Sequence, residues 1–245
     1  MINGLAGGAP AFLASVTSPE EARLAVISGA SIIDCKDPST GALGALEAST
    51  IGAIVAAVGG RVPVSATIGD LPSEPGIMVN AAKTIAATGV DIVKAGFFGE
   101  ADPRAAIAAL GQADLVPAKC VAVLMADREP DFALVADLAR AGFVGVMLDT
   151  ADKAAGSLPD ILDTTTLAAF IAEARKHGLA SGLAGSLRVH HIAGLVALAP
   201  DVIGFRGALC GAARTDALDA KRVASVRTSI DAAVRALHPA KRSVA

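Results

Sequence analysis

The chain has 245 residues, a mass of 24.2 kDa and a formal net charge of -3 at pH 7. α/β barrels commonly reach about 250 residues as one unit, so this length favours a single domain spanning residues 1–245, with its core at about 11–237. The small negative charge and the lack of a basic run argue against nucleic acid or an anionic membrane as partner. Because the chain has no Trp or Tyr, its core must consist of small aliphatic residues, which suit a parallel sheet covered by helices.

The cysteines and the apolar segments exclude several other classes. Cys35, Cys120 and Cys210 are widely spaced, which predicts neither a disulfide framework nor a zinc site, and no metal or cofactor is expected. Reduced thiols in the cytoplasm are the default. Residues 1–16 are apolar, but no Lys or Arg precedes Arg23, so we expect no secretory leader. No apolar run reaches about 18 uninterrupted residues, so no membrane span is expected.

Short apolar runs alternate with stretches of helical periodicity along the chain. The predicted strands are Ala11–Val16, Ser31–Lys36, Val62–Thr67, Asp91–Ala95, Lys119–Leu124, Val144–Asp149, Leu179–Leu183 and Asp201–Phe205. The clearest helical stretches are Glu20–Ile27, Ile77–Ala87, Phe132–Ala141, Leu167–Arg175 and Val223–Leu237. Ser18 precedes Pro19 and two glutamates, which is typical of a helix start. Glycines 29, 89, 142 and 178 are expected to close helices in a left-handed conformation.

This alternation predicts parallel strands with crossover helices. Eight strand–helix units favour a single-domain (β/α)8 TIM barrel, with a doubly wound open sheet as the alternative. No Gly-x-Gly-x-x-Gly turn follows the first predicted strand, which weakens that alternative. In such barrels the chemistry lies at the carboxyl ends of the strands.

Three predicted strands carry an ionisable residue at or next to their carboxyl end: Lys36, Lys94 and Asp149, with Lys153 shortly after the last. Because side chains alternate along a strand, Lys36 shares a face with Asp34, Lys94 with Ile92, and Asp149 with Met147. If these faces line one interior, the charged groups converge. An ammonium beside a second ammonium in a partly dry pocket becomes easier to deprotonate, which favours a lysine nucleophile and imine chemistry. Asp149 would then transfer protons or orient a lysine.

Other polar residues occupy the same ends of later or neighbouring strands. Ser65 and Thr67 belong to the third predicted strand, whereas Gly185 and Ser186 follow the seventh and Arg206 and Gly207 the eighth. Barrels commonly hold a phosphate on backbone N–H groups of the last two loops. Glycine allows close approach to the anion, and Arg206 would add positive charge. Ordinary turn glycines would give the same spacing.

Several motifs together resemble the (5-formylfuran-3-yl)methyl phosphate synthase family, which makes the furan precursor of methanofuran and of a related C1 carrier. The resemblance extends from about Phe12 to Gly211, and its motifs are Asp34-Cys35-Lys36-Asp37-Pro38, Gly41-Ala42-Leu43-Gly44, residues 63–70, Val93-Lys94-Ala95-Gly96, residues 147–151, residues 182–187 and residues 206–211.

The resemblance implies that two molecules of glyceraldehyde 3-phosphate condense into (5-formylfuran-3-yl)methyl phosphate, with loss of phosphate and water in a lyase-type reaction. By position, Lys36 would form the Schiff base and Lys94 would accept a proton, with Asp149 and Lys153 as the remaining acid–base pair. The Ala154-Ala155-Gly156 segment departs from the more polar family sequence and bears on whether Lys153 reaches the site. The strand pattern alone leaves open which of Lys36 and Lys94 carries the imine.

Two alternative functions remain at this point. A class I aldolase acting on another phosphorylated sugar would form the same imine without releasing phosphate. A non-catalytic phosphate-binding barrel would need no reactive lysine. Partners are expected to be small phosphorylated trioses, and the alanine-rich residues 105–109 suggest a self-association surface and hence a homo-oligomer.

Overall fold

Eight parallel strands form the centre of the molecule in the computed structural model, which describes residues 9–99 and 101–237. The strands are β1 (Ala11–Val16), β2 (Ile32–Cys35), β3 (Val64–Thr67), β4 (Ile92–Phe97), β5 (Lys119–Met125), β6 (Gly145–Asp149), β7 (Ala180–Leu183) and β8 (Val202–Phe205). Each pairs with the next, and β8 pairs with β1, where Ala11 lies opposite Val202. This closure confirms the TIM barrel and excludes the doubly wound open sheet.

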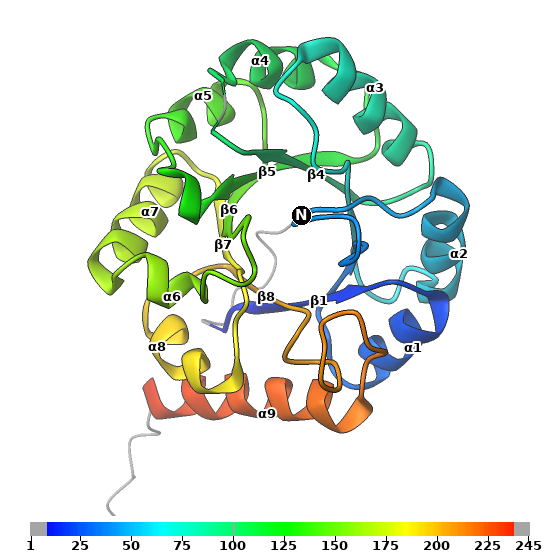
Figure 1. The fold of residues 1–245 in the computed structure, drawn as a ribbon, viewed down its shortest axis with the longest axis vertical. Coiled ribbons are helices and arrows are strands. Elements are labelled where there is room, and N and C mark those ends of the chain that lie inside the picture. The colour runs from blue at the N-terminus through cyan, green and yellow to red at the C-terminus, as the bar shows by residue number, and fades with distance from the viewer. Residues whose placement is uncertain (1–8, 100, 238–245) are drawn as a thin grey trace, which may run out of the picture.

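The helices surround the barrel as an outer ring (Figure 1). They are α1 (Pro19–Ile27), α2 (Ala48–Val58), α3 (Pro75–Ala86), α4 (Arg104–Gln112), α5 (Leu134–Arg140), α6 (Leu158–Ile161), α7 (Thr164–Lys176), α8 (Ile192–Ala197) and α9 (Ala220–Leu237). The helix α9 packs against both α8 and α1 and so completes the ring beside β8 and β1. Among the helices of residues 9–99 and 101–237, none is long and apolar enough to cross a membrane. The first eight residues, expected not to form a secretory leader, lie outside the described part.

Two apolar layers follow from the alternation of side chains along the strands. Ile32, Ile92 and Met147 belong to a cluster that fills the barrel interior. Ile33 and Cys35, which alternate with Ile32 and Asp34, pack instead with the helices in the larger outer core. The predicted division of faces is therefore confirmed, and the residues that share a face with Ile32 point into the barrel.

Local signals in the sequence set several helix ends. Ser18 accepts a hydrogen bond from the Glu21 N–H at 3.2 Å and caps α1, as predicted. The four glycines expected to close helices have φ between +72° and +96°. None of the predicted helical stretches covers α2, which lacks a side-chain cap at Glu47. Its buried residues Ile51, Ile54 and Val58 follow helical spacing, but the alanines and Val55 on its other faces are apolar too, so the buried face does not stand out in the sequence.

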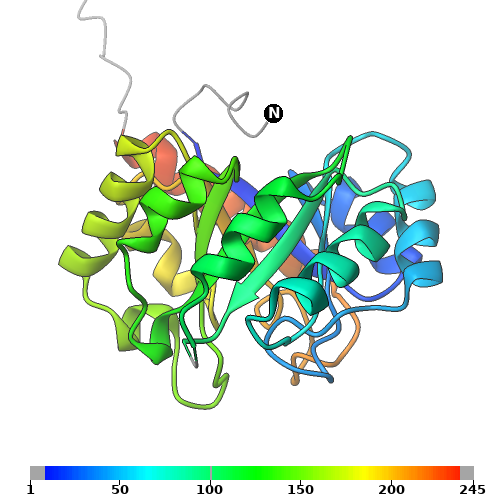
Figure 2. The same cartoon turned by 90° about the horizontal axis from the view of Figure 1, so that it is seen from above.

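The loops at one end of the barrel carry the candidate site. Figure 2 shows the loops after β2, β6 and β8 extending from the same end of the barrel. The loop after β2 is held by Asp70, whose carboxylate accepts the N–H groups of Ala42 and Leu43 at 2.8 and 2.7 Å. Such bonds replace the regular backbone pairing that a loop lacks. The loop is thereby fixed beside the pocket.

The helix α4 carries the predicted self-association surface only in part. Ala106 and Ile107 pack inward, whereas Ala105 and Ala108 are exposed. Arg104 at the start of this helix pairs with Asp131 and Asp137. The homo-oligomer stays a prediction.

Candidate functional site

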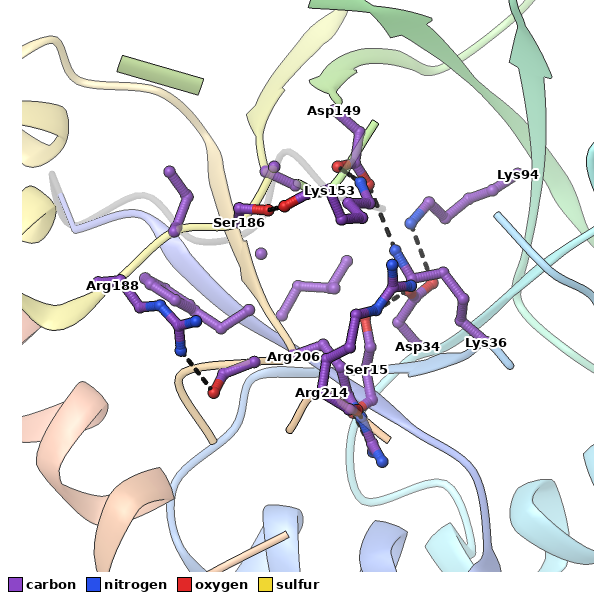
Figure 3. Close-up of a pocket in the computed structure, with 17 residues that line it drawn as sticks. Ser15, Asp34, Lys36, Lys94, Asp149, Lys153, Ser186, Arg188, Arg206 and Arg214 are labelled. Carbon is purple, nitrogen blue, oxygen red and sulfur yellow. Dashed lines mark hydrogen bonds and ion pairs between the residues drawn. The ribbon is translucent and has the colours of Figure 1, made fainter. Parts of the chain in front are cut away.

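A pocket of about 150 Å³ opens at the carboxyl ends of the strands. Figure 3 shows charged side chains from several strands and loops pointing into it. Its ionisable lining consists of Asp34, Lys36, Lys94, Asp149, Lys153, Arg188, Arg206 and Arg214. The four residues predicted to be catalytic thus lie in one pocket, as convergence of the strand ends requires.

Asp149 joins two of the lysines. One carboxylate oxygen accepts a hydrogen bond from Lys36 Nζ at 3.3 Å, and the other accepts one from Lys153 Nζ. The Lys36 and Asp149 side chains are 7% and 4% exposed, so this pair lies in a largely water-free environment. Lys36 is one residue beyond β2, and its backbone N–H still bonds to the Val16 carbonyl oxygen. The strand pairing therefore fixes the direction of its side chain.

Lys94 forms a second, deeper ion pair with Asp34. Its Nζ lies 3.0 Å from Asp34 Oδ1, and the two side chains are 4% and 0% exposed. Ser65 donates to the same oxygen at 2.7 Å, and Ser15 donates to the other at 2.9 Å. Every oxygen of Asp34 is therefore hydrogen-bonded, as burial of a carboxylate demands. The predicted residue Ser65 reaches the site through Asp34.

The charges in the pocket stabilise the ionised carboxylates. Burial by itself would raise the pKa of Asp34, but the Lys94 and Lys36 ammonium groups outweigh it and hold the pKa below its usual value. For Asp149 the burial effect is likewise overcome, here by Lys36 and Lys153, and its pKa is well below the usual range. Both residues are thus carboxylates at neutral pH.

Lys153 is the lysine whose ammonium form is disfavoured. Burial lowers its pKa, Asp149 opposes this effect, and the charge of Lys36 adds to the lowering. Lys153 comes from the loop after β6, where Asp127 accepts the N–H groups of Ala151 and Asp152, each at 2.7 Å. This anchor brings Lys153 back onto Asp149, despite the departure of the following residues from the family sequence.

Thr67 lies close to the site but outside the lining of the pocket. The residue is fully buried, and its hydroxyl donates to the Gly44 carbonyl oxygen at 3.0 Å. In the described structure Thr67 therefore supports the loop after β2. A contact with substrate stays a prediction.

The loops after β7 and β8 form the other side of the pocket through Gly185, Ser186 and Gly207. Gly185 has φ of +108°, and a Cβ there would lie 2.8 Å from Thr150 Cγ2, so this turn against β6 requires glycine. Ser186 Oγ lies 3.4 Å from the Lys153 carbonyl oxygen. These loops approach the lysine cluster closely enough to border the same ligand.

Arg206 forms hydrogen bonds with several other residues of the protein. Its two Nη atoms bind the Glu21 carboxylate, with the shorter contact at 2.6 Å. The other donors bind carbonyl oxygens of Ser15, Arg214 and Asp216. All five N–H groups of the guanidinium are engaged, so a phosphate would have to displace one of these bonds. Phosphate binding by Arg206 stays a prediction, and its observed contacts organise the loop.

Two arginines of the pocket were not predicted from the sequence. Arg188 donates to the Gly207 carbonyl oxygen at 2.9 Å, and Arg214 donates to the Gly41 carbonyl oxygen at 3.2 Å. Both follow the carboxyl ends of strands, β7 and β8, but several residues into the loops. Their distance from the strands removes the alternation that predicted the direction of Lys36 and Lys94. The only available signal was their place in site-forming loops.

The fold and the pocket define a class: a (β/α)8 barrel with a buried, lysine-centred site that is rich in positive charge. Residues 12–227 match the family described as 4-HFC-P synthase. The chain therefore belongs to the 4-HFC-P synthase family, which consists of enzymes. The recognised resemblance is confirmed.

Individual relatives agree over nearly the whole chain. A Methylorubrum extorquens protein that provisionally carries the name (5-formylfuran-3-yl)methyl phosphate synthase is 45% identical over 96% of this chain and 98% of its own length. The synthase of that name from Methanosarcina acetivorans is 33% identical, with 84% and 93% covered. The one from Methanocaldococcus jannaschii is 35% identical, with 81% and 89% covered.

Solved structures support the fold alone. Phosphoribosyl anthranilate isomerase from Thermus thermophilus superposes with a TM-score of 0.65 at 16% identity, covering 91% of this chain and 98% of the isomerase. Thiamine phosphate pyrophosphorylase from Pyrococcus furiosus gives 0.63 at 10% identity, with 92% and 97% covered. At such low identity the structural similarity supports the barrel fold alone and does not indicate an activity.

Proposed function

We propose that this enzyme condenses two molecules of glyceraldehyde 3-phosphate into (5-formylfuran-3-yl)methyl phosphate, with release of phosphate and water, through a Schiff base on Lys36. The names of its relatives support the product. The observation that carries the mechanism is the convergence of Lys36, Lys94 and Lys153 around two buried carboxylates in one pocket. A lysine imine supplies an enamine nucleophile for carbon–carbon bond formation without a metal.

Lys36 is the better placed of the two strand-end lysines for the imine. Lys94 lies deeper, bound to an Asp34 carboxylate that two serines already fix. Among the residues that the structure describes, Lys36 Nζ donates one hydrogen bond, to Asp149, at a longer 3.3 Å. Breaking that contact to react with an aldehyde costs less than removing Lys94 from its fully satisfied pair. Lys94 would then act as a proton acceptor in its neutral form, and Asp34 would hold it in place.

Lys153 and Asp149 form the proposed proton-transfer unit. With its pKa lowered by burial, Lys153 is present as the neutral amine at lower pH than an ordinary lysine, and in that form it can take a proton from a substrate carbon or hydroxyl. Asp149 stays ionised and bridges Lys153 to Lys36. It can thus stabilise the cationic iminium on Lys36 while it orients Lys153. Formation of the furan requires repeated proton removal and donation, which such a unit supplies.

The test combines product analysis with trapping of the imine. The protein is incubated with glyceraldehyde 3-phosphate while phosphate release and furan absorbance are followed, and a parallel sample is reduced with borohydride for peptide mass mapping. We expect furan, released phosphate and a reduced adduct on Lys36. Lys36→Met should abolish the adduct and the furan, whereas Lys83→Met on the exposed face of α3 should change neither.

Other outcomes point to the alternatives. An adduct on Lys94 would exchange the two lysine roles. An adduct without phosphate release or furan would identify an aldolase acting on phosphorylated sugars. The absence of any adduct would contradict the imine mechanism and favour a phosphate-binding barrel.

A further inference from the structure

The loop after β8 presents Arg214 from a fixed backbone. The Arg214 carbonyl oxygen accepts a hydrogen bond from Arg206 Nε at 2.9 Å. Asp216 accepts the N–H groups of Ala212 and Ala213, each at 2.8 Å. The other end of the loop is tied to Glu21, which accepts the Leu218 N–H. Because both ends of the loop are hydrogen-bonded to buried groups, the position of Arg214 is set by the fold.

The Arg214 side chain crosses the pocket mouth toward the loop after β2. Its Nη2 donates to the Gly41 carbonyl oxygen, and within residues 9–99 and 101–237 its other N–H groups bond to no protein acceptor. Asp70 fixes that facing loop through Ala42 and Leu43. The guanidinium is thus held between two anchored loops with most of its donors available. Arg214 lines the same pocket as the lysine cluster; burial lowers its pKa, and Asp149 opposes this effect.

The pocket carries a surplus of positive charge. Six cationic side chains and two carboxylates line it, and Glu21 offsets Arg206. The formal surplus is three positive charges with Lys153 protonated and two with Lys153 in the neutral form that the proposed reaction uses. A phosphate monoester carries about −1.5 to −2 at neutral pH. Two phosphates therefore need every cation that the pocket offers, and a guanidinium with available donors is suited to bind one of them.

The two arginines with available donors lie on different sides of the pocket. Arg188 bonds to Gly207 and borders the loops after β7 and β8. Arg214 bonds to Gly41 on the side of β2, and Figure 3 shows it nearer to Lys36 than Arg188 is. A phosphate on the β7 and β8 loops would use Arg188. The Arg214 guanidinium then remains available on the β2 side of the pocket, where Lys36 lies.

We propose that Arg214 binds a second phosphate group in this pocket, separate from the phosphate bound at Arg188 and the loops after β7 and β8. The inference rests on the proposed function, in which two phosphorylated trioses occupy the pocket together. The ligand class is a phosphate monoester, and the planar guanidinium can bind two of its oxygens at once. This site supplies the second anion position that the condensation requires.

The experiment is calorimetric titration of the full chain with inorganic phosphate. We expect two phosphates per wild-type chain. Arg214→Met should retain one and weaken the other about tenfold or more, as expected for loss of a charged hydrogen-bond pair. Arg188→Met should weaken the opposite site, and Arg222→Met, which removes an exposed cation of α9, should leave both unchanged.

Arg214→Lys serves as the second variant in case Arg214→Met fails to fold. It keeps the positive charge but loses the planar guanidinium that binds two phosphate oxygens. The affinity of the Arg214 site should therefore lie between those of the wild type and Arg214→Met. One phosphate per wild-type chain, or two unchanged sites in either Arg214 variant, would overturn the proposal. Furan formation with only one bound phosphate would refute the second site and leave the proposed function intact. Two bound phosphates without any furan would support the second site and contradict the proposed function.

Discussion

Lys153 gives the proposed reaction its expected dependence on pH. Its folded-state pKa is lowered by burial, so its neutral, basic form appears at lower pH than in an ordinary lysine. We expect furan formation to rise as the pH increases through this lowered pKa. Lys153→Met should reduce the rate on the order of 100-fold, the usual contribution of a general base, and should remove this ascending limb. The pH profiles of initial rates provide the measurement.

A matched control for Lys153 is Lys176→Met, which removes an exposed lysine at the end of α7. Its profile should coincide with that of the wild type. A Lys153→Met profile of unchanged shape and height would show that another group accepts the proton.

The sequence predicted the residues whose direction a strand fixes. Lys94 lies within β4, and Lys36 continues the pairing of β2 with β1, so alternation alone placed both in the interior. Arg188 and Arg214 lie in loops, where direction depends on long-range bonds to Gly207 and Gly41. The bonds of Arg206 to Ser15 and Glu21 likewise depend on groups far away in the chain. No local sequence pattern predicts such distant hydrogen-bond partners.

The buried pair between Glu21 of α1 and Arg206 connects a helix start to the loop after β8. Their side chains are 9% and 6% exposed, and Glu21 also accepts the Thr17 and Leu218 N–H groups. Glu21→Gln leaves the Arg206 charge buried without its partner. We expect a loss of about 3 kcal/mol in the free energy of unfolding, measured by urea denaturation.

The neighbouring Glu20→Gln is the control for Glu21→Gln. Glu20 faces solvent, and within residues 9–99 and 101–237 its one ion pair is with exposed Arg23, so its replacement should change the free energy of unfolding by less than about 0.5 kcal/mol. Equal effects of the two variants would contradict a structural role for the Glu21 pair.

Helix α4 approaches the turn after α5 at Gly111. A Cβ at this position would lie 2.2 Å from the Ala141 carbonyl oxygen, so Gly111→Ala must displace backbone. We expect a loss of about 1–3 kcal/mol or more. Gly52 in α2 has no atom within 4 Å of such a Cβ, so Gly52→Ala should stabilise by up to about 1 kcal/mol. Thermal unfolding of both variants compares them, and a stabilised Gly111→Ala would contradict the close approach.

At the level of elements, strands were easier to predict than helices. The strands are short apolar runs bounded by turns, and the described β1 coincides with the predicted Ala11–Val16. Helices such as α2 and α8 are apolar and lack a side-chain cap. Their surfaces contact neighbouring helices as well as the barrel, which blurs the periodic face. Tertiary packing, more than local sequence, defines them.

At the scale of the whole molecule, the buried ion pairs connect strands around the barrel. Asp34 of β2 binds Lys94 of β4, whereas Lys36 binds Asp149 of β6. The pKa values of both carboxyls are lowered in the folded protein. Their stabilisation is therefore present above the unfolded-state pKa of about 3.9, and it is lost as the pH falls through the lower folded-state values.

We expect the free energy of unfolding to fall below about pH 4, with each of these two carboxyls adding up to about 1.4 kcal/mol per pH unit to the slope. Asp149→Asn removes one titrating group and should flatten this slope by that amount. At neutral pH the same variant should be less stable than the wild type, because Lys36 and Lys153 lose their shared partner. Urea denaturation at a series of pH values measures both effects.

Asp114→Asn, at an exposed position before β5, controls for the general effect of removing a carboxylate. It should leave the acid slope close to that of the wild type. The crossing pattern expected for Asp149→Asn, less stable at neutral pH but less sensitive to acid, follows only if Asp149 is ionised in the folded barrel and bound to the lysines. A slope unchanged by Asp149→Asn would mean that this carboxyl has the same pKa in the folded and unfolded chains, and the lysines would then not stabilise its charge as the proposed proton-transfer unit requires.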